Sequence, residues 1–287
     1  MDRILKYLSL VKFSHTIFAL PFALIGFFLA VQYAHHSLDW KVLLLVLVCM
    51  VTARNAAMGF NRFADRKIDK LNPRTSSREM PSGKISPFAA IIFILANVAV
   101  FILSTWFINK LVFYLSPVAL LVVLGYSLTK RFTFLCHFVL GLGLSLAPIG
   151  AYLSVTGAFD IVPMFFSFIV LFWTAGFDII YALQDDDFDK EHELFSIPAW
   201  LGKRKALLVS AIVHLLSAVL IIIAGMFAAF GLWYWIGAFI FISLLVYQHS
   251  IVKHDDLSRV NVAFFTTNGI ASVLFACFTI ISLLLLR

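Results

Sequence analysis

The chain has 287 residues, of which 62% are hydrophobic and only 13% are charged. A soluble domain is usually close to one quarter charged, and no soluble fold of this size could bury so much apolar surface. The composition therefore excludes a soluble protein and predicts an integral membrane protein. The net charge of +7 does not indicate a nucleic-acid partner, because the basic residues follow the membrane topology.

Nine apolar runs are each long enough to cross a bilayer, which takes about 20 residues. They occupy residues 16–34, 40–60, 86–108, 111–128, 134–154, 161–183, 206–228, 232–252 and 262–286. Pro21 and Gly26 interrupt the first run, so we expect a retained span rather than a cleaved signal peptide. Backbone groups in lipid need internal partners, which predicts helices. We expect an all-α polytopic membrane protein, with a single transmembrane domain over residues 1–287.

Loop charge predicts the orientation. Of the 22 Lys and Arg residues, all but Lys41, Lys110 and Arg287 fall on one side of the predicted topology. By the positive-inside rule this basic side faces the cytoplasm. We expect the protein in the lipid bilayer of a bacterial inner membrane, with a central cavity open to the cytoplasmic side.

The first acidic cluster follows the second predicted span. Asn61, Asp65 and Asp69 are spaced four residues apart, so on a helix they drift by roughly 40° per step and line one wall of a cavity. Amide and carboxylate oxygens suit Mg²⁺, which typically keeps one or two carboxylates plus substrate phosphate oxygens. The interleaved Arg62, Arg66 and Lys67 can reach phosphate oxygens. The alternative is a solvated helix end.

The second acidic cluster follows the sixth predicted span, on the same side. Asp185 and Asp189 repeat the spacing of four, and Asp178 and Tyr181 precede them on the same stretch. Carboxylates this close repel one another unless cations are present, which favours a divalent metal and a phosphate-bearing substrate. Tyr181 is predicted to face the cavity as a donor to pyrophosphate or as a π-face, although an aromatic-belt position is the alternative. Asp178 either pairs with a base or lines the cavity.

Five ordered motifs give the chain a family resemblance. They are Lys12-Phe-Ser-His15 through Pro21, Asn61-x3-Asp65-x3-Asp69, Arg74-Thr75 through Arg78 and Pro81-Ser82-Gly83, Tyr126-x3-Lys130-Arg131, and Asp185-x3-Asp189. Together they resemble the UbiA superfamily of intramembrane prenyltransferases, most closely its 4-hydroxybenzoate polyprenyltransferase type. Many members carry Asn-Asp at the start of the first motif, whereas here Arg62 follows Asn61. Arg62 is expected to project from a different face and not to remove metal binding.

The resemblance implies Mg²⁺-dependent transfer of a polyprenyl group from polyprenyl diphosphate to a small aromatic acceptor such as 4-hydroxybenzoate, with release of pyrophosphate. It implies a metal site at Asn61, Asp65, Asp69, Asp185 and Asp189, and a catalytic set of those four Asp residues with Lys130. Arg66 and Lys130 are the expected phosphate contacts. Lys12, Lys130 and Arg131 are candidates for an acceptor carboxylate. His15, Asp69 and Asp178 are the alternatives for taking the ring proton.

Two alternative functions follow from the same features. One is a related enzyme with a naphthoate, futalosine-pathway or haem acceptor, because the acidic motifs are shared within the superfamily. The other is a secondary transporter, which also uses intramembrane acids but places them near the bilayer midplane. The acids here cluster at one membrane face, which favours the prenyltransferase.

Overall fold

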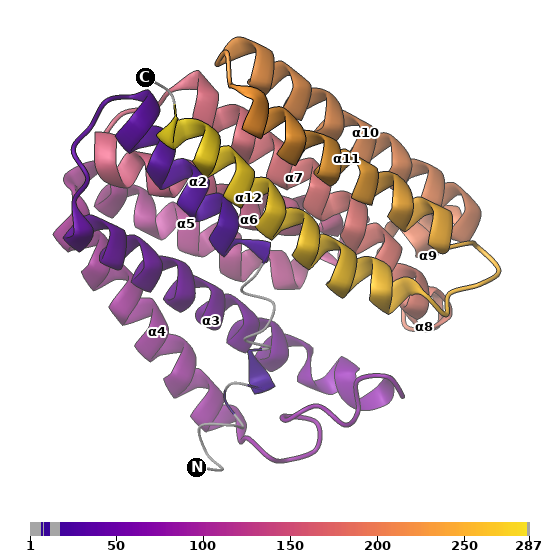
Figure 1. Cartoon of the computed structure of the whole chain (residues 1–287). Helices are drawn as coiled ribbons and strands as arrows, with labels where there is room; N and C mark the ends of the chain where they lie inside the picture. Colours follow the sequence, from indigo (N-terminus) through magenta and orange to yellow (C-terminus); the bar gives the residue numbers. More distant parts are fainter. Residues whose placement is uncertain (1–6, 8, 12–17, 286–287) are drawn as a thin grey trace.

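Figure 1 shows the computed structural model, which describes residue 7, residues 9–11 and residues 18–285. Within these residues the regular structure is entirely helical. The long helices are α3 (Trp40–Leu71), α4 (Pro87–Ile108), α5 (Lys110–Thr129), α6 (Cys136–Thr156), α7 (Ile161–Ala182), α10 (Lys203–Phe227), α11 (Leu232–Ile251) and α12 (Asn268–Leu284). The short ones are α2 (Leu20–Phe28) with the turn η2 (Leu29–Tyr33), η3 (Leu183–Asp185), α8 (Asp186–Glu191), α9 (Ile197–Leu201) and η4 (Val262–Thr267).

The described part of the chain has eight helices that are long and apolar enough to cross a membrane, plus a shorter apolar helix at Leu20–Tyr33. These nine segments correspond to the nine predicted spans, and the all-α membrane fold is confirmed. The second span differs, because α3 continues beyond the predicted end at residue 60 as far as Leu71. The Arg and Lys residues of the extension lower its hydropathy but are good helix formers, so the polar extension stays helical. It stops at Asn72, whose backbone is extended.

Several helices begin at a polar residue that caps their first turn. Asp39, Ser86, Asn109 and Asp160 each accept a hydrogen bond from a first-turn N–H group of α3, α4, α5 and α7, respectively. Asn109 alone separates α4 from α5, and its side-chain amide also donates to the Leu153 carbonyl at 2.8 Å. This residue therefore makes the tight turn and ties it to the end of α6.

The helices form one bundle in which α6 and α7 pack together and α10 lies against α7. In Figure 1, α3 and α4 lie on one side of the bundle and α10 and α11 on the other. The α6–α7 approach is so close that a Cβ atom at Gly141 would lie 2.4 Å from the Leu171 carbonyl oxygen.

An aromatic core occupies the α7–α12 side. The buried Trp173 ring packs against Phe22 and Phe241, with centroid distances of 5.3 and 5.6 Å, and Phe275 contacts both phenylalanines. A cavity lies beside this core, between α3, α5, α6 and α7.

The two acidic segments meet at one end of the bundle. Asn72, just after α3, donates from its side-chain amide to the Asp185 carboxylate in η3 at 3.0 Å. A residue of the first segment's loop therefore touches the second segment, although 113 positions separate them.

Candidate active site

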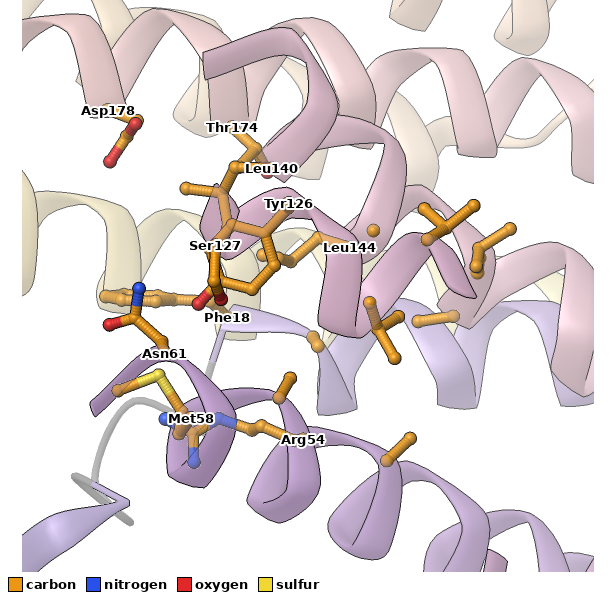
Figure 2. A pocket seen from close by; sticks show the side chains of 18 of the residues that line it. Phe18, Arg54, Met58, Asn61, Tyr126, Ser127, Leu140, Leu144, Thr174 and Asp178 are labelled. Carbon is orange, nitrogen blue, oxygen red and sulfur yellow. The ribbon is translucent and has the colours of Figure 1, made fainter. Parts of the chain in front are cut away.

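A cavity of about 630 Å³ opens between α3, α5, α6 and α7. Figure 2 shows side chains from these helices pointing into the same space, with Asn61 and Asp178 among them. One end is polar and holds both acidic segments, whereas the other is lined by apolar residues such as Met50, Val123 and Ala147. A cavity with one charged end and a long apolar interior suits an amphiphilic ligand.

The first acidic motif lines the cavity along one face of α3, as its spacing predicts. The Asn61 amide donates to the Asp65 carboxylate at 3.2 Å. Asp65 also accepts from the Arg131 guanidinium at 3.0 Å and lies 3.8 Å from the Lys130 ammonium. Since Asp65 is only 4% exposed, these partners compensate the burial of its charge.

Asp69 lies one turn farther along the same face. One carboxylate oxygen accepts from Arg78 at 2.8 Å, whereas the other, Oδ2, is buried and has no partner within the described residues. The Asp69 backbone carbonyl accepts from the Thr75 hydroxyl at 3.0 Å, which fixes the loop after α3. An unsatisfied carboxylate oxygen facing a cavity is a ready ligand for a hard cation.

The second acidic motif is held by the same loop. Arg74 donates from Nε to Asp185 at 2.9 Å and from a second nitrogen to its other oxygen, and it also donates to the Tyr181 hydroxyl at 3.0 Å. Burial lowers the pKa of Arg74, but the hydrogen bonds and charge of Asp185 outweigh this effect and raise it. Asp189, 7% exposed, lines the cavity and interacts with Ser196.

Asp178 and Tyr181 both line the cavity. Asp178 lies 2.7 Å from Nδ1 of His137, whose Nε2 accepts from the Ile197 N–H at 3.2 Å. The second nitrogen is therefore an acceptor, and the ring proton lies on Nδ1, pointing at the carboxylate. Tyr181 stacks on Phe264 with centroids 4.1 Å apart, so its ring belongs to an aromatic wall.

Two predicted binding residues do not line the cavity, and a third is not described. Arg66 does not line the cavity; its guanidinium lies 4.3 Å from the centroid of the Phe63 ring and donates to the Phe63 carbonyl. Arg131 does not line it either, although it reaches Asp65. Lys12 lies outside the described residues, as does His15.

Several cavity residues had no assigned role in the sequence analysis. Arg74 and Arg78 are visible there only as part of the loop motif, and His137 carries no motif signal. Arg62 is 6% exposed and lines the cavity, contrary to the expectation that it projects from another face. Comparison with Asp69, seven residues or about two helical turns away, would have placed Arg62 on the cavity side.

The carboxylates do not already converge as they would around a bound ion. Among the described residues, no three His, Cys, Asp or Glu side chains form a group that could hold a metal as they stand. Asp65, Asp69 and Asp185 are paired with basic side chains instead, so a metal ion held by these three would displace those partners.

Comparison with known proteins identifies the family. Residues 19–270 match the model of the UbiA prenyltransferase family. The chain belongs to this family. It is 30% identical over 237 residues to a 4-hydroxybenzoate octaprenyltransferase of Aliivibrio fischeri strain MJ11, covering 83% of the chain and 82% of that relative. It is 29% identical over 238 residues to the enzyme of that name from Tolumonas auensis, covering 83% of each.

Solved UbiA structures share the fold. A UbiA homologue from Aeropyrum pernix K1, in its apo form, superposes with a TM-score of 0.80 at 28% identity, covering 92% of this chain and 95% of that one. A homologue from Archaeoglobus fulgidus bound to GPP and Mg²⁺ has a TM-score of 0.74 at 21% identity, covering 98% and 100%. This UbiA family member is therefore an integral membrane prenyltransferase.

Proposed function

We propose that the chain transfers a polyprenyl group from polyprenyl diphosphate to an aromatic acceptor such as 4-hydroxybenzoate, releasing pyrophosphate, as a step of quinone biosynthesis. The observation that carries this proposal is the shape of the cavity, in which two acidic segments meet at one end and an apolar interior continues from them. The diphosphate suits the polar end and the prenyl tail the apolar one. The names of the bacterial relatives support the acceptor class.

Residues of both acidic segments fit a divalent cation. Their donors are carboxylate and amide oxygens, and Asp69 Oδ2 is buried without a partner. Asn61, Asp65 and Asp69 would hold Mg²⁺ from α3, and Asp185 and Asp189 from the opposite side. A bound Mg²⁺ supplies charge stabilisation of the departing pyrophosphate.

Basic residues of the chain complete the diphosphate site. When the acids turn to the metal, Arg74, Arg78 and Lys130 lose their present partners. Their N–H groups are then available to phosphate oxygens in a partly buried setting, where charge-assisted hydrogen bonds are strong. Arg74 and Arg78 replace Arg66 as the proposed phosphate contacts, because Arg66 lies off the cavity.

The cavity walls suit the carbon chemistry. An allylic cation survives only where water is excluded, and the interior beside the acidic end is lined by Phe18, Phe177 and Phe264. The electron-rich faces of such aromatic rings attract a nearby cation and would stabilise the allylic cation. Asp178, oriented by His137, faces the same space and is placed to accept the acceptor's proton.

We also propose that the polar end faces the cytoplasm, on the strength of the asymmetry of basic residues. A cysteine introduced at the exposed Ser76 should react with an impermeant maleimide in inverted vesicles and not in intact cells, once the native cysteines are replaced. Labelling in intact cells but not in inverted vesicles would show that the polar end faces away from the cytoplasm.

The reaction is tested with detergent-purified protein, Mg²⁺, geranyl diphosphate and a panel of phenolic, naphthoate and haem acceptors. We expect acceptor-dependent pyrophosphate release with 4-hydroxybenzoate and its loss on adding EDTA. Turnover only with a different aromatic acceptor would support prenyl transfer but show that 4-hydroxybenzoate is not the acceptor. No release with any donor or acceptor would refute the proposal.

A further inference from the structure

Arg62 is a buried cation for which the described residues provide no hydrogen-bond or ion-pair partner. The residue is 6% exposed and lines the cavity, and Nε makes no hydrogen bond. Within the described part of the chain, no hydrogen bond or ion pair engages its guanidinium. A guanidinium presents five donors, so its burial without an acceptor is costly.

The other cations that line the cavity are engaged. Arg74, Arg78 and Lys130 each pair with an aspartate, and Arg54 donates to the Val11 carbonyl at 2.9 Å. The acidic groups that interact electrostatically with Arg62 are Asp69, Tyr126 and Glu79, and the cation that does so is Arg78. Asp69 already pairs with Arg78, and Glu79 accepts from the Ser9 hydroxyl. Within the described residues the resting structure therefore leaves the Arg62 guanidinium without a hydrogen-bonded acceptor beside the acidic end.

The position of Arg62 on α3 explains why its side chain reaches the cavity. Asp65 and Asp69 follow it by three and seven residues, close to one and two turns, so all three lie on one face. Arg54 and Met58 continue that face toward the interior, as Figure 2 shows for both. Arg62 thus lies between the metal-binding face and the interior.

We propose that Arg62 is an anion-binding residue that receives a substrate oxygen, and that this oxygen belongs to the diphosphate of the donor. The proposal rests on the proposed function and deepens it. The charges around Arg62 favour the diphosphate, because the single carboxylate of Asp69 is shared between two cations, Arg62 and Arg78, and a multiply charged anion would offer acceptors to both. The alternative anion for Arg62 is the carboxylate of the aromatic acceptor.

A binding role and a packing role for Arg62 predict opposite effects on stability. Replacing an unpaired buried charge by an apolar side chain of similar size is neutral or stabilising, whereas removing a structural ion pair destabilises. Arg62→Met should therefore unfold at the same or a higher temperature while it binds its ligand less tightly. A residue that served only packing would lower the unfolding temperature.

The experiment compares Arg62→Met and Arg62→Lys with Lys70→Met, a control that removes an exposed cation from the same helix away from the cavity. Equilibrium binding of inorganic pyrophosphate with Mg²⁺, and separately of 4-hydroxybenzoate, is measured together with KM for donor and acceptor. We expect Arg62→Met to weaken pyrophosphate binding and raise the donor KM by about 10- to 100-fold. Arg62→Lys should recover part of the loss, and the control should match the unmodified protein.

The outcomes separate the two proposals. A selective rise in the acceptor KM would keep the anion site and assign it to the acceptor carboxylate. Unchanged binding and both KM values unchanged in Arg62→Met would overturn the inference, as would a lowered unfolding temperature with unchanged pyrophosphate binding. If the unmodified protein binds pyrophosphate but prenylates no aromatic acceptor, the proposed reaction fails while the Arg62 inference is still decided by binding.

Discussion

Replacing His137 by leucine should destabilise the protein by an amount that follows from its two hydrogen bonds. His137 is 2% exposed and joins Asp178 on α7 to the Ile197 N–H that begins α9. Without the ring, a backbone N–H group loses its acceptor, at a cost of about 1–3 kcal/mol. The Asp178 carboxylate also loses a charge-assisted hydrogen bond, for which similar groups contribute about 1.5–3 kcal/mol.

The two costs do not add in full. The Asp178 side chain is 23% exposed, so water at the cavity replaces part of the lost bond. We therefore expect His137→Leu to lower the free energy of unfolding by about 2–4 kcal/mol. His137→Gln retains an N–H donor and an oxygen acceptor, so it should recover more than half of the loss.

Unfolding is followed by circular dichroism during titration of dodecyl maltoside micelles with sodium dodecyl sulphate. His192→Leu is the control, because within the described residues the His192 ring contacts only Phe188, whose carbonyl and ring lie one turn earlier in the adjoining α8. A His137→Leu variant within about 0.5 kcal/mol of the unmodified protein, the usual range for surface changes, would refute the bridging role.

Three further outcomes are expected. Asp65→Asn and Asp189→Asn should each lower kcat by about 100-fold or more in the pyrophosphate-release assay, because each removes a proposed metal ligand near the developing charge; activity within tenfold of the original would remove that residue from the site. EDTA should abolish turnover and excess Mg²⁺ restore it, and activity that persists through chelation would exclude a metal role. Gly141→Val should destabilise by about 1–3 kcal/mol, measured in the same detergent titration, since its side chain would press on the Leu171 carbonyl; an unaffected transition would show that α6 and α7 separate easily.

The fold was largely predictable because membrane spans are local features. Each span carries its own apolar run, and polar caps such as Asp39 and Ser86 lie where the runs begin. The end of α3 was not predictable from hydropathy, since the helix continues through charged residues to Leu71. The face of α3 that carries Asn61, Asp65 and Asp69 followed from helical spacing, and the structure places all three along the cavity.

The basic residues that pair with the aspartates could not be predicted from helical spacing. Arg74 and Arg78 lie in an irregular loop, whose path across the end of the bundle has no periodicity to extrapolate. Arg66 lies on the same helix as the motif, but its guanidinium packs over the Phe63 ring instead of facing the cavity. Arg62 was counted among the bases that can reach phosphate oxygens, but its place in the cavity was not predicted because its direction was judged against its neighbour Asn61 rather than against Asp69 two turns away. The contributions of individual site residues remain predictions.

The pairing of acids with bases bears on how the proposed diphosphate site would discriminate against the phospholipids that surround a membrane protein. A bilayer presents phosphate headgroups at high local concentration, and each of them resembles half of a diphosphate. In the described structure, Arg74, Arg78 and Lys130 are already occupied by aspartates, so a lipid phosphate arriving alone would have to displace carboxylates that have nowhere else to turn. A diphosphate that arrives with divalent cations offers those carboxylates new partners at the same moment. If the proposed function holds, the resting ion pairs at these three cations would favour metal-loaded diphosphates over abundant membrane lipids.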